Sequence, residues 1–304
     1  MKKRLSKFLS MIMIAALIVT GFTGFAGNVG AYAAEGDTPL LIATAPQLEA
    51  KVYVSISNKG DLVVRQQSVD VVDTDDDGAL TVSDALYCAH EKYYKGGAEE
   101  GYAASIGQYG LGIDKLWGDT SYNFGYYVND VMSMGAGDAI KDGDYVNAYI
   151  YKDGVGYSDK YTFFNTHKIG LKTNASKTFK LSYAGYTVTA PLKYAVIMIN
   201  GEHTEIGTGK KGKFKLNFNQ SGSYFISADH EEETIVPPTL IVFVQPEKGE
   251  VIEVKDKKYT VTKLGTVKTG KKGKVTFSKS ANNGKEAPKT VDYAGVTYKV
   301  KVVD

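Results

Sequence analysis

Oxygen-bearing side chains recur through the twelve-residue stretch "DTDDDGALTVSD" at a spacing that suits a hard cation. They fall at positions 1, 3, 5, 9 and 12, which are Asp73, Asp75, Asp77, Thr81 and Asp84. Calcium takes about six to eight oxygen ligands from a loop that curls around it. Ala79 at position 7 can add its carbonyl oxygen, and Gly78 at position 6 permits the sharp turn. The spacing therefore predicts a calcium site in residues 73–84.

The stretch resembles the EF-hand loop at positions 1, 3, 5 and 6. Position 12 differs, because Asp84 stands where an EF-hand carries Glu, and this substitution resembles the calcium loops of dockerin-type modules. The alternative is a solvated acidic turn, since Asp and Gly both favour turns. Four Asp residues within five positions would repel one another without a cation, which favours the metal site. Asp76, at position 4, is expected to point outward.

The segments on either side of the loop predict how it is held. Residues 82 to about 94 show apolar residues at helical spacing, with Thr81 as a plausible N-cap and Asp84 in the first turn. The preceding "DLVVRQQSVDVV" is rich in Val and predicts a strand, so the entering helix of an EF-hand is missing. Sensor EF-hands act by opening paired helices. A single loop of this kind is expected to stabilise local structure.

The beginning of the sequence predicts the compartment. Residues 1–34 combine a basic start, an apolar run and an A-x-A site at residues 31–33, which is typical of a secretory signal peptide. A transmembrane anchor is the weaker alternative, and no other stretch is apolar enough to span a membrane. Cys88 is the one cysteine, so no disulfide framework is expected. Beside His90 it could suggest a metal or a nucleophile, but a small buried helix residue is the better interpretation.

Charge is distributed unevenly along the chain, and the scarcity of arginine argues against nucleic-acid binding. Residues 35–246 carry 18 basic and 27 acidic side chains, a balance of −9, whereas residues 247–304 carry 14 Lys and 7 acidic side chains, a balance of +7. Only Arg4 and Arg65 are arginine. Recognition of nucleic acids and phosphates relies on arginine, so no nucleic-acid partner is expected.

Alternating apolar residues and turn pairs predict three domains in a mainly β chain. Residues 48–165 form a strand framework interrupted by the calcium loop and one short helix. Residues 166–246 are predicted to form a β-sandwich, with "KFKLNF" alternating strictly and Asn200-Gly201 favouring a hairpin. Residues 250–304 begin with "DKKYTVTKL" and end with "GVTYKVKVV", which predicts a small β-module rich in Lys.

The segment "LWGDTSYNFGYYVNDVMSMGAGDAIKDGDYVNAYIYKD" resembles the transcobalamin-like C-terminal domain of secreted bacterial proteins. The positions that carry the resemblance are an aromatic pair, a "VN" and a "KDGD" turn: Tyr126, Tyr127, Val128, Asn129, Lys141, Asp142, Gly143 and Asp144. It implies a β-grasp-like first domain with the calcium loop inserted. The family includes cobalamin binders, but this sequence shows no accompanying helical domain. The middle segment is similar to bacterial immunoglobulin-like modules, and the last to short β-repeats of cell-surface proteins.

Motifs for catalysis are weak, so no enzyme is expected. "HEEET" at 230–234 begins like a zinc-protease helix, but Thr234 stands where the second His must fall. No G-x-S-x-G elbow occurs. Tyrosine suits recognition of glycans or proteins, and one strand places three on one face, opposite three apolar residues. This predicted ligand face consists of Tyr145, Tyr149 and Tyr151; half-buried strand tyrosines are the alternative.

Together these observations predict a secreted, non-enzymatic, calcium-binding surface or adhesion-type protein of a Gram-positive bacterium. Its ligand would be a glycan or a protein. The alternatives are an accessory module protein of polysaccharide utilisation, as the dockerin-like loop suggests, and a glycan-active hydrolase. Residues 247–304 are expected to hold an anionic cell-wall polymer, unless their Lys residues simply protect edge strands from aggregation. No transmembrane anchor is expected.

Overall fold

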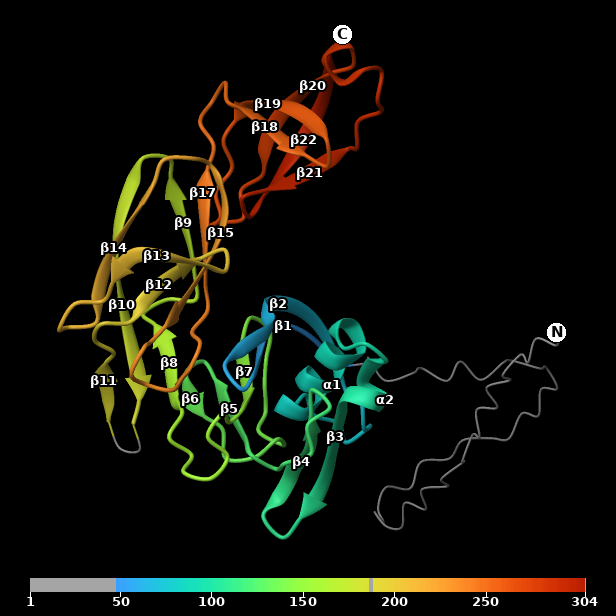
Figure 1. The fold of residues 1–304 in the computed structure, drawn as a ribbon. Coiled ribbons are helices and arrows are strands. Elements are labelled where there is room, and N and C mark those ends of the chain that lie inside the picture. Colours follow the sequence, from blue (N-terminus) through green and yellow to red (C-terminus); the bar gives the residue numbers. More distant parts are fainter. Residues whose placement is uncertain (1–47, 186–187, 304) are drawn as a thin grey trace, which may run out of the picture. The chain divides into compact units, whose positions relative to one another are not determined.

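The protein is mainly β (Figure 1), and its described residues form three large hydrophobic cores and a smaller fourth cluster of Tyr127, Tyr149, Tyr161 and Val236. The computed structural model describes residues 48–185 and 188–303. The predicted signal peptide, residues 1–34, lies outside the described residues. Within them, no helix has the length and apolar character needed to cross a membrane.

The first domain is built on a five-stranded sheet in the order β2-β1-β7-β5-β6. Its strands are β1 (Glu49–Asn58), β2 (Asp61–Val72), β5 (Phe124–Val128), β6 (Val131–Met132) and β7 (Tyr145–Ile150). β1 and β2 form an antiparallel hairpin, and β7 returns parallel to β1 in the centre of the sheet. A hairpin, a helix and a last strand parallel to the first make this a β-grasp-like arrangement, as expected.

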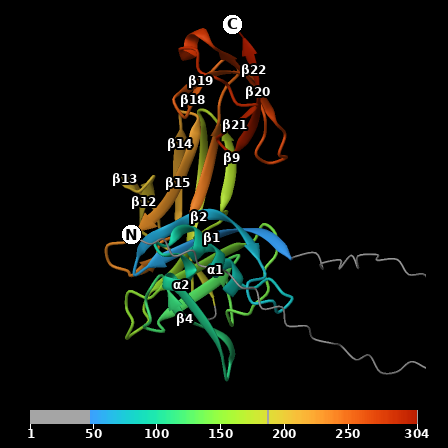
Figure 2. The same cartoon turned by 90° about the vertical axis from the view of Figure 1, so that its right-hand side faces the viewer.

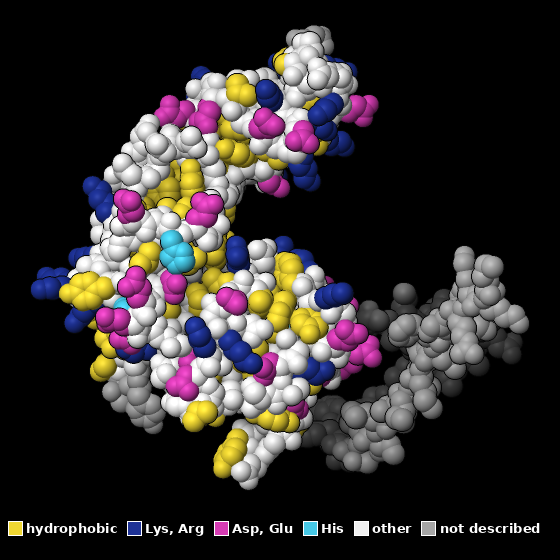
Figure 3. Space-filling view, viewed as in Figure 1, with side chains coloured by type: hydrophobic (Ala, Val, Ile, Leu, Met, Phe, Trp, Pro, Cys, Tyr) yellow, Lys and Arg dark blue, Asp and Glu magenta, His cyan; other side chains and the backbone are white. Residues whose placement is uncertain are grey.

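Two helices and a second hairpin complete the first domain (Figure 2). They are α1 (Val82–Tyr93), α2 (Gly97–Gly101), β3 (Tyr102–Gly107) and β4 (Gly110–Leu116). The helix predicted after the acidic loop is therefore present, and the five-residue α2 was not foreseen. The core between helix and sheet contains Val52, Val54 and Leu86, all 0% exposed. Hydrophobic side chains are exposed at the tip of the β3–β4 hairpin (Figure 3), where Tyr109 is 92% accessible.

The second domain is a β-sandwich of two five-stranded sheets. One contains β8 (Lys160–Phe164), β10 (Ala175–Ala184), β11 (Thr189–Pro191), β14 (Lys213–Phe218) and β16 (Ile235–Val236). The other has the order β13-β12-β15-β17-β9, with bounds β9 (Lys168–Lys172), β12 (Val196–Ile199), β13 (Glu202–Gly207), β15 (Gly222–Asp229) and β17 (Leu240–Gln245). The predicted hairpin at Asn200-Gly201 joins β12 to β13, and both residues have positive φ.

The boundary between the first two domains differs from the expected one. Residues 160–164 fall within the predicted first domain, 48–165, but β8 pairs with β10 and β16 of the sandwich. Its Phe164 is buried in the core of the second domain. The sequence of β8 alone fits either domain. Its place is decided by pairing with β10 and β16, which lie 11 to 76 residues away along the chain.

The third domain is one five-stranded sheet in the order β18-β19-β20-β22-β21. Its elements are β18 (Val251–Val254), β19 (Lys257–Lys263), β20 (Gly273–Ser278), the short 3₁₀ helix η1 (Ser280–Asn282), β21 (Thr290–Tyr293) and β22 (Val296–Val303). One face of the sheet buries Tyr259, Phe277 and Tyr298, each at most 2% exposed. The segments "DKKYTVTKL" and "GVTYKVKVV", from which the sequence predicted this domain, contain β19 and β22.

Candidate metal site

The acidic loop connects the end of β2 to the start of α1. β2 ends at Val72 and α1 begins at Val82, so residues 73–81 form the turn between strand and helix. Thr81 caps α1: its hydroxyl accepts a hydrogen bond from the Asp84 amide, while the Asp84 carboxylate accepts one from the Thr81 amide. This reciprocal cap fixes Asp84 at the helix N-terminus, where negative charge is favoured.

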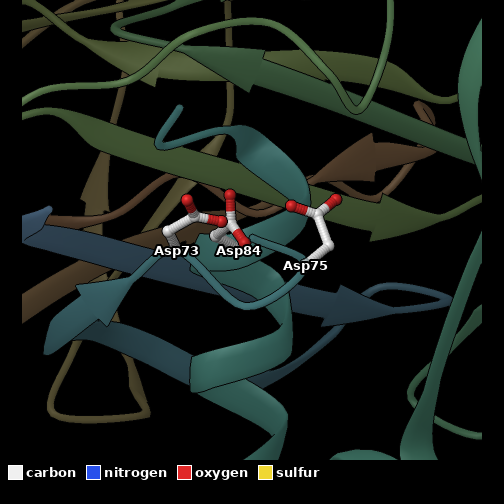
Figure 4. A group of neighbouring side chains, drawn as sticks. All are labelled: Asp73, Asp75 and Asp84. Carbon is white, nitrogen blue, oxygen red and sulfur yellow. The ribbon is translucent and has the colours of Figure 1, made fainter. Parts of the chain in front are cut away.

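Three of the predicted ligands converge in the structure (Figure 4). Asp73, Asp75 and Asp84 each place a carboxylate oxygen within 4.8 Å of the others. Two oxygens that bind one calcium ion at about 2.3–2.6 Å are at most about 5 Å apart, so the cluster matches a shared ion. Asp84 is buried, Asp73 is half-buried and Asp75 is exposed, which leaves one side of the cluster accessible from solvent.

Asp77 is the one predicted carboxylate ligand that does not belong to this cluster. A side-chain oxygen of Asp77 accepts a hydrogen bond from the Ala79 amide at 2.8 Å, and the Thr81 hydroxyl donates to Asp84 at 2.7 Å. Gly78 has a φ of +84°, as the turn requires, and its amide donates to Asp73 at 2.9 Å. These bonds curl the loop, and the carboxylates of Asp73, Asp77 and Asp84 all accept hydrogen bonds within it.

The carboxylate of Asp84 is already fully hydrogen-bonded. Oδ1 accepts from the amide and hydroxyl of Thr74, and Oδ2 accepts from the amide and hydroxyl of Thr81. A carboxylate has about four acceptor sites. Asp84 can therefore bind a cation only if one of these hydrogen bonds is released, and the Thr74 hydroxyl is the group that can rotate away.

Electrostatics in the loop favour an added positive charge. Desolvation, followed by repulsion from Asp77, Asp84 and Asp73, raises the pKa of Asp75. The Gly78 amide lowers the pKa of Asp73. Among the ion pairs of the described residues, none joins a Lys or Arg to this cluster. The repulsion between the carboxylates is thus left for a bound cation to offset.

The predicted ligand face of Tyr145, Tyr149 and Tyr151 requires a correction. Tyr149 is only 2% exposed, because its ring packs against Tyr127 and Tyr161 with centroid distances of 6.4 and 6.3 Å. Its hydroxyl donates to Tyr151 at 3.1 Å. Tyr145 and Tyr149 share one side of β7, as the alternation predicts, whereas Tyr151 follows the end of the strand, and at Tyr149 that side is covered. Tyr145 and Tyr151 are half-buried.

Cys88 and His90 do not form a reactive pair. Both ring nitrogens of His90 are occupied, Nδ1 by the Leu86 carbonyl at 2.6 Å and Nε2 by the Trp117 amide at 2.9 Å. Burial lowers the pKa of His90 to about 4 and raises the pKa of the Cys88 thiol. A thiol with a raised pKa is a poor nucleophile. Both residues are therefore packed in the first domain. His90 is buried, and Cys88 is half-buried against the hydrophobic core.

Comparisons with known proteins add little. No family model matches the sequence, and no curated protein matches it. Among solved structures, the N-terminal four immunoglobulin domains of Dscam1 isoform 6.9 align with 46% of this chain and 32% of their own, at 10% identity and a TM-score of 0.21. Fibronectin(III)-like modules of Clostridium thermocellum CbhA align with 40% of this chain and 76% of their own, at 8% identity and a TM-score of 0.23. Similarity at this level transfers no function.

Proposed function

We propose that the protein is a secreted, non-enzymatic surface or adhesion-type protein whose first domain is stabilised by one calcium ion. The observation that carries the calcium proposal is the convergence of Asp73, Asp75 and Asp84 at the N-terminus of α1. Asp73 and Asp75 would supply carboxylate oxygens from the loop, and Asp84 would supply one after the Thr74 hydroxyl turns away. Secretion is inferred from the predicted signal peptide, and the ligand class remains a glycan or a protein.

The proposed role of calcium is structural. The loop joins the edge strand β2 to the helix that covers the sheet, so an ion there would tie strand to helix. In the described residues this loop type occurs once, which does not suit a switch built from paired EF-hands. We expect a dissociation constant on the order of 10⁻⁴–10⁻³ M, as in extracellular modules.

We propose that the protein is not an enzyme, and the hydrogen-bond partners of its four histidines support this. His90 is buried with both nitrogens bonded, and His167 and His203 each pair with an aspartate at 3.1 Å. The imidazole of His230 contacts the Lys193 carbonyl and nearby amides of its own turn. In the described part of the chain, none of these histidines forms a hydrogen bond with a Ser or Cys side chain that it could activate.

Calcium binding is tested by titration and by thermal unfolding. Trp117 is the one tryptophan of the chain and packs in the first core, so its fluorescence reports on that domain. With calcium at about 100 times its dissociation constant, the first domain should gain about 2.7 kcal/mol of stability over an EDTA-treated sample. Asp75→Asn should abolish most of this gain.

Asp76→Asn is the matched control, because it removes the same charge from the same loop outside the converging cluster. It should leave calcium binding within a few-fold of the parent. If calcium and EDTA give equal melting temperatures for the parent protein, the calcium proposal is wrong. Equal losses in Asp75→Asn and Asp76→Asn would reduce the site to diffuse attraction by an acidic loop.

A further inference from the structure

The third domain has one sheet face that is rich in lysine and hydroxyl side chains. Its opposite face is the core, formed by alternating residues such as Val261, Val275 and Tyr298. The residues between them on β20 and β22 face outward: Lys274, Thr276, Ser278, Thr297, Lys299 and Lys301. Lys274, Lys299 and Lys301 are exposed. Figure 3 shows Lys side chains on the surface of this domain in dark blue.

Strand register places Lys263, Lys274 and Lys299 in one row across this face. Lys263 of β19 is opposite Lys274 of β20, and Lys274 is opposite Lys299 of β22. An irregularity in β19 between Val261 and Lys263 turns Lys263 to this outer face. Neighbouring strands are about 4.8 Å apart, so the three lysines form a line across the sheet. Lys301 continues the charge along β22, about 6.6 Å further on, opposite Thr276.

This row is costly for the isolated fold. Like charges directly opposite each other on neighbouring strands destabilise a sheet. Among the ion pairs of the described residues, none involves Lys263, Lys274 or Lys299. The acidic residues of this sheet lie on its outer strands, Glu253 on β18 and Asp292 on β21, and Asp292 already accepts the Thr297 hydroxyl at 2.6 Å.

Protection against aggregation does not explain the row. Lysine guards a sheet when it lies on an edge strand, where unpaired backbone groups could recruit another chain. The edges of this sheet are β18 and β21, whereas the row lies on its three inner strands, β19, β20 and β22. Each inner strand is paired on both sides, so its lysines have no edge to protect. Edge protection therefore does not account for Lys263, Lys274 and Lys299.

We propose that this row, with Lys301, binds a linear, hydroxyl-bearing anionic polymer that lies across the sheet. Residues 247–304 contain no arginine, so bidentate recognition of nucleic-acid phosphates is not available. The outward side chains of β20 and β22 include no aromatic ring on which a base could stack. Lysines supply single charges, and the Thr and Ser hydroxyls between them can bond sugar hydroxyls or the anionic groups. Carboxylate and phosphodiester polymers share this chemistry.

The test compares two sets of substitutions in the whole protein. The row variant carries Lys263→Gln, Lys274→Gln and Lys299→Gln. The control carries Lys255→Gln, Lys268→Gln and Lys279→Gln, which remove the same charge from positions outside the row. Binding to polygalacturonate and to poly(glycerol phosphate) is measured at about 50 mM and about 500 mM salt. The two polymers separate the carboxylate from the phosphodiester source.

At low salt the row variant should bind at least one polymer on the order of tenfold more weakly than the parent, while the control stays within about threefold. The row variant should also melt at an equal or higher temperature, because opposed charges have been removed. Equal losses in both variants would overturn the proposal. So would a parent protein that binds neither polymer, or that binds duplex DNA or anionic lipid vesicles more tightly than both.

Discussion

Asp84 and Thr81 are joined by three hydrogen bonds, and this pair connects the acidic loop to the helix. The Thr81 hydroxyl donates to the Asp84 carboxylate at 2.7 Å and accepts from the Asp84 amide at 3.3 Å, while the Thr81 amide donates to the same carboxylate at 2.9 Å. Both residues are buried. The same carboxylate also holds Thr74 at the far end of the loop. These bonds hold the two ends of the loop together.

Loss of the cap should destabilise the first domain without calcium. Thr81→Ala removes the hydroxyl that caps α1, and such substitutions cost about 1 kcal/mol. Thr81→Ser keeps the hydroxyl and should restore most of the loss. Thr120→Ala is the control, because Thr120 is exposed and lies outside the helix. Trp117 fluorescence during urea unfolding in EDTA provides the measurement; equal stability of Thr81→Ala and the parent would contradict the capping role.

Removing the Thr74 hydroxyl should separate the stability of the loop from its affinity for calcium. Thr74→Ala leaves Asp84 Oδ1 with only the Thr74 amide as donor, so the calcium-free domain should lose about 1 kcal/mol. The freed acceptor site should keep calcium affinity equal to the parent or make it tighter. Calorimetric titration tests this, and a Thr74→Ala protein that binds calcium more weakly would show that the hydroxyl itself is a ligand.

Much of the fold was predictable because the alternation of apolar and polar residues along one strand shows directly which side chains are buried. Phe214, Leu216 and Phe218 are all buried and the polar residues between them are exposed, as "KFKLNF" predicts. Partners of strands are not visible in this pattern. The covering of Tyr149 depends on Tyr161 of β8, and the assignment of β8 depends on β10 and β16. Both errors arose where one side of a strand meets another part of the chain.

The loop shows the same division between local and distant information. Spacing alone identified Asp73, Asp75 and Asp84, because their positions within one turn decide where their carboxylates lie. The Ala79 amide donates to Asp77 and the Asp84 amide donates to the Thr81 hydroxyl, and these amide orientations are not encoded by any spacing pattern. Likewise, the lysine row of the third domain appears only when the register of β19, β20 and β22 is known.

Acid should weaken the first domain through His90. Its pKa is lowered to about 4 in the folded protein from an ordinary value of 6.5, chiefly by burial, so the unfolded chain binds more protons between these values. The stability that the neutral imidazole contributes is complete above pH 6.5 and is lost as the pH falls toward 4, by about 3 kcal/mol at most. His90→Gln cannot titrate and should flatten the pH dependence, even if its stability at pH 7 is lower. His203→Gln, at an exposed site, should retain the slope of the parent.

The contact between Gly125 and Tyr149 should make a glycine indispensable in β5. A Cβ atom on Gly125 would lie 2.3 Å from a ring carbon of Tyr149 and 2.4 Å from its hydroxyl oxygen, far inside contact distance. Tyr149 is packed on its other sides by aromatic rings, so it has little room to move. Gly125→Ala should therefore cost about 1–3 kcal/mol, as overpacking of a core does.

Gly112 of β4 provides the matched comparison, because it also lies in a strand and a Cβ atom added there would meet nothing within 4 Å. Gly112→Ala should change the unfolding free energy by less than about 1 kcal/mol, since added Cβ atoms in open strand positions are tolerated. The double substitution Gly125→Ala with Tyr149→Leu should recover part of the loss, because the shorter side chain vacates the space. If Gly125→Ala alone is as stable as Gly112→Ala, Tyr149 does not occupy the buried position described above.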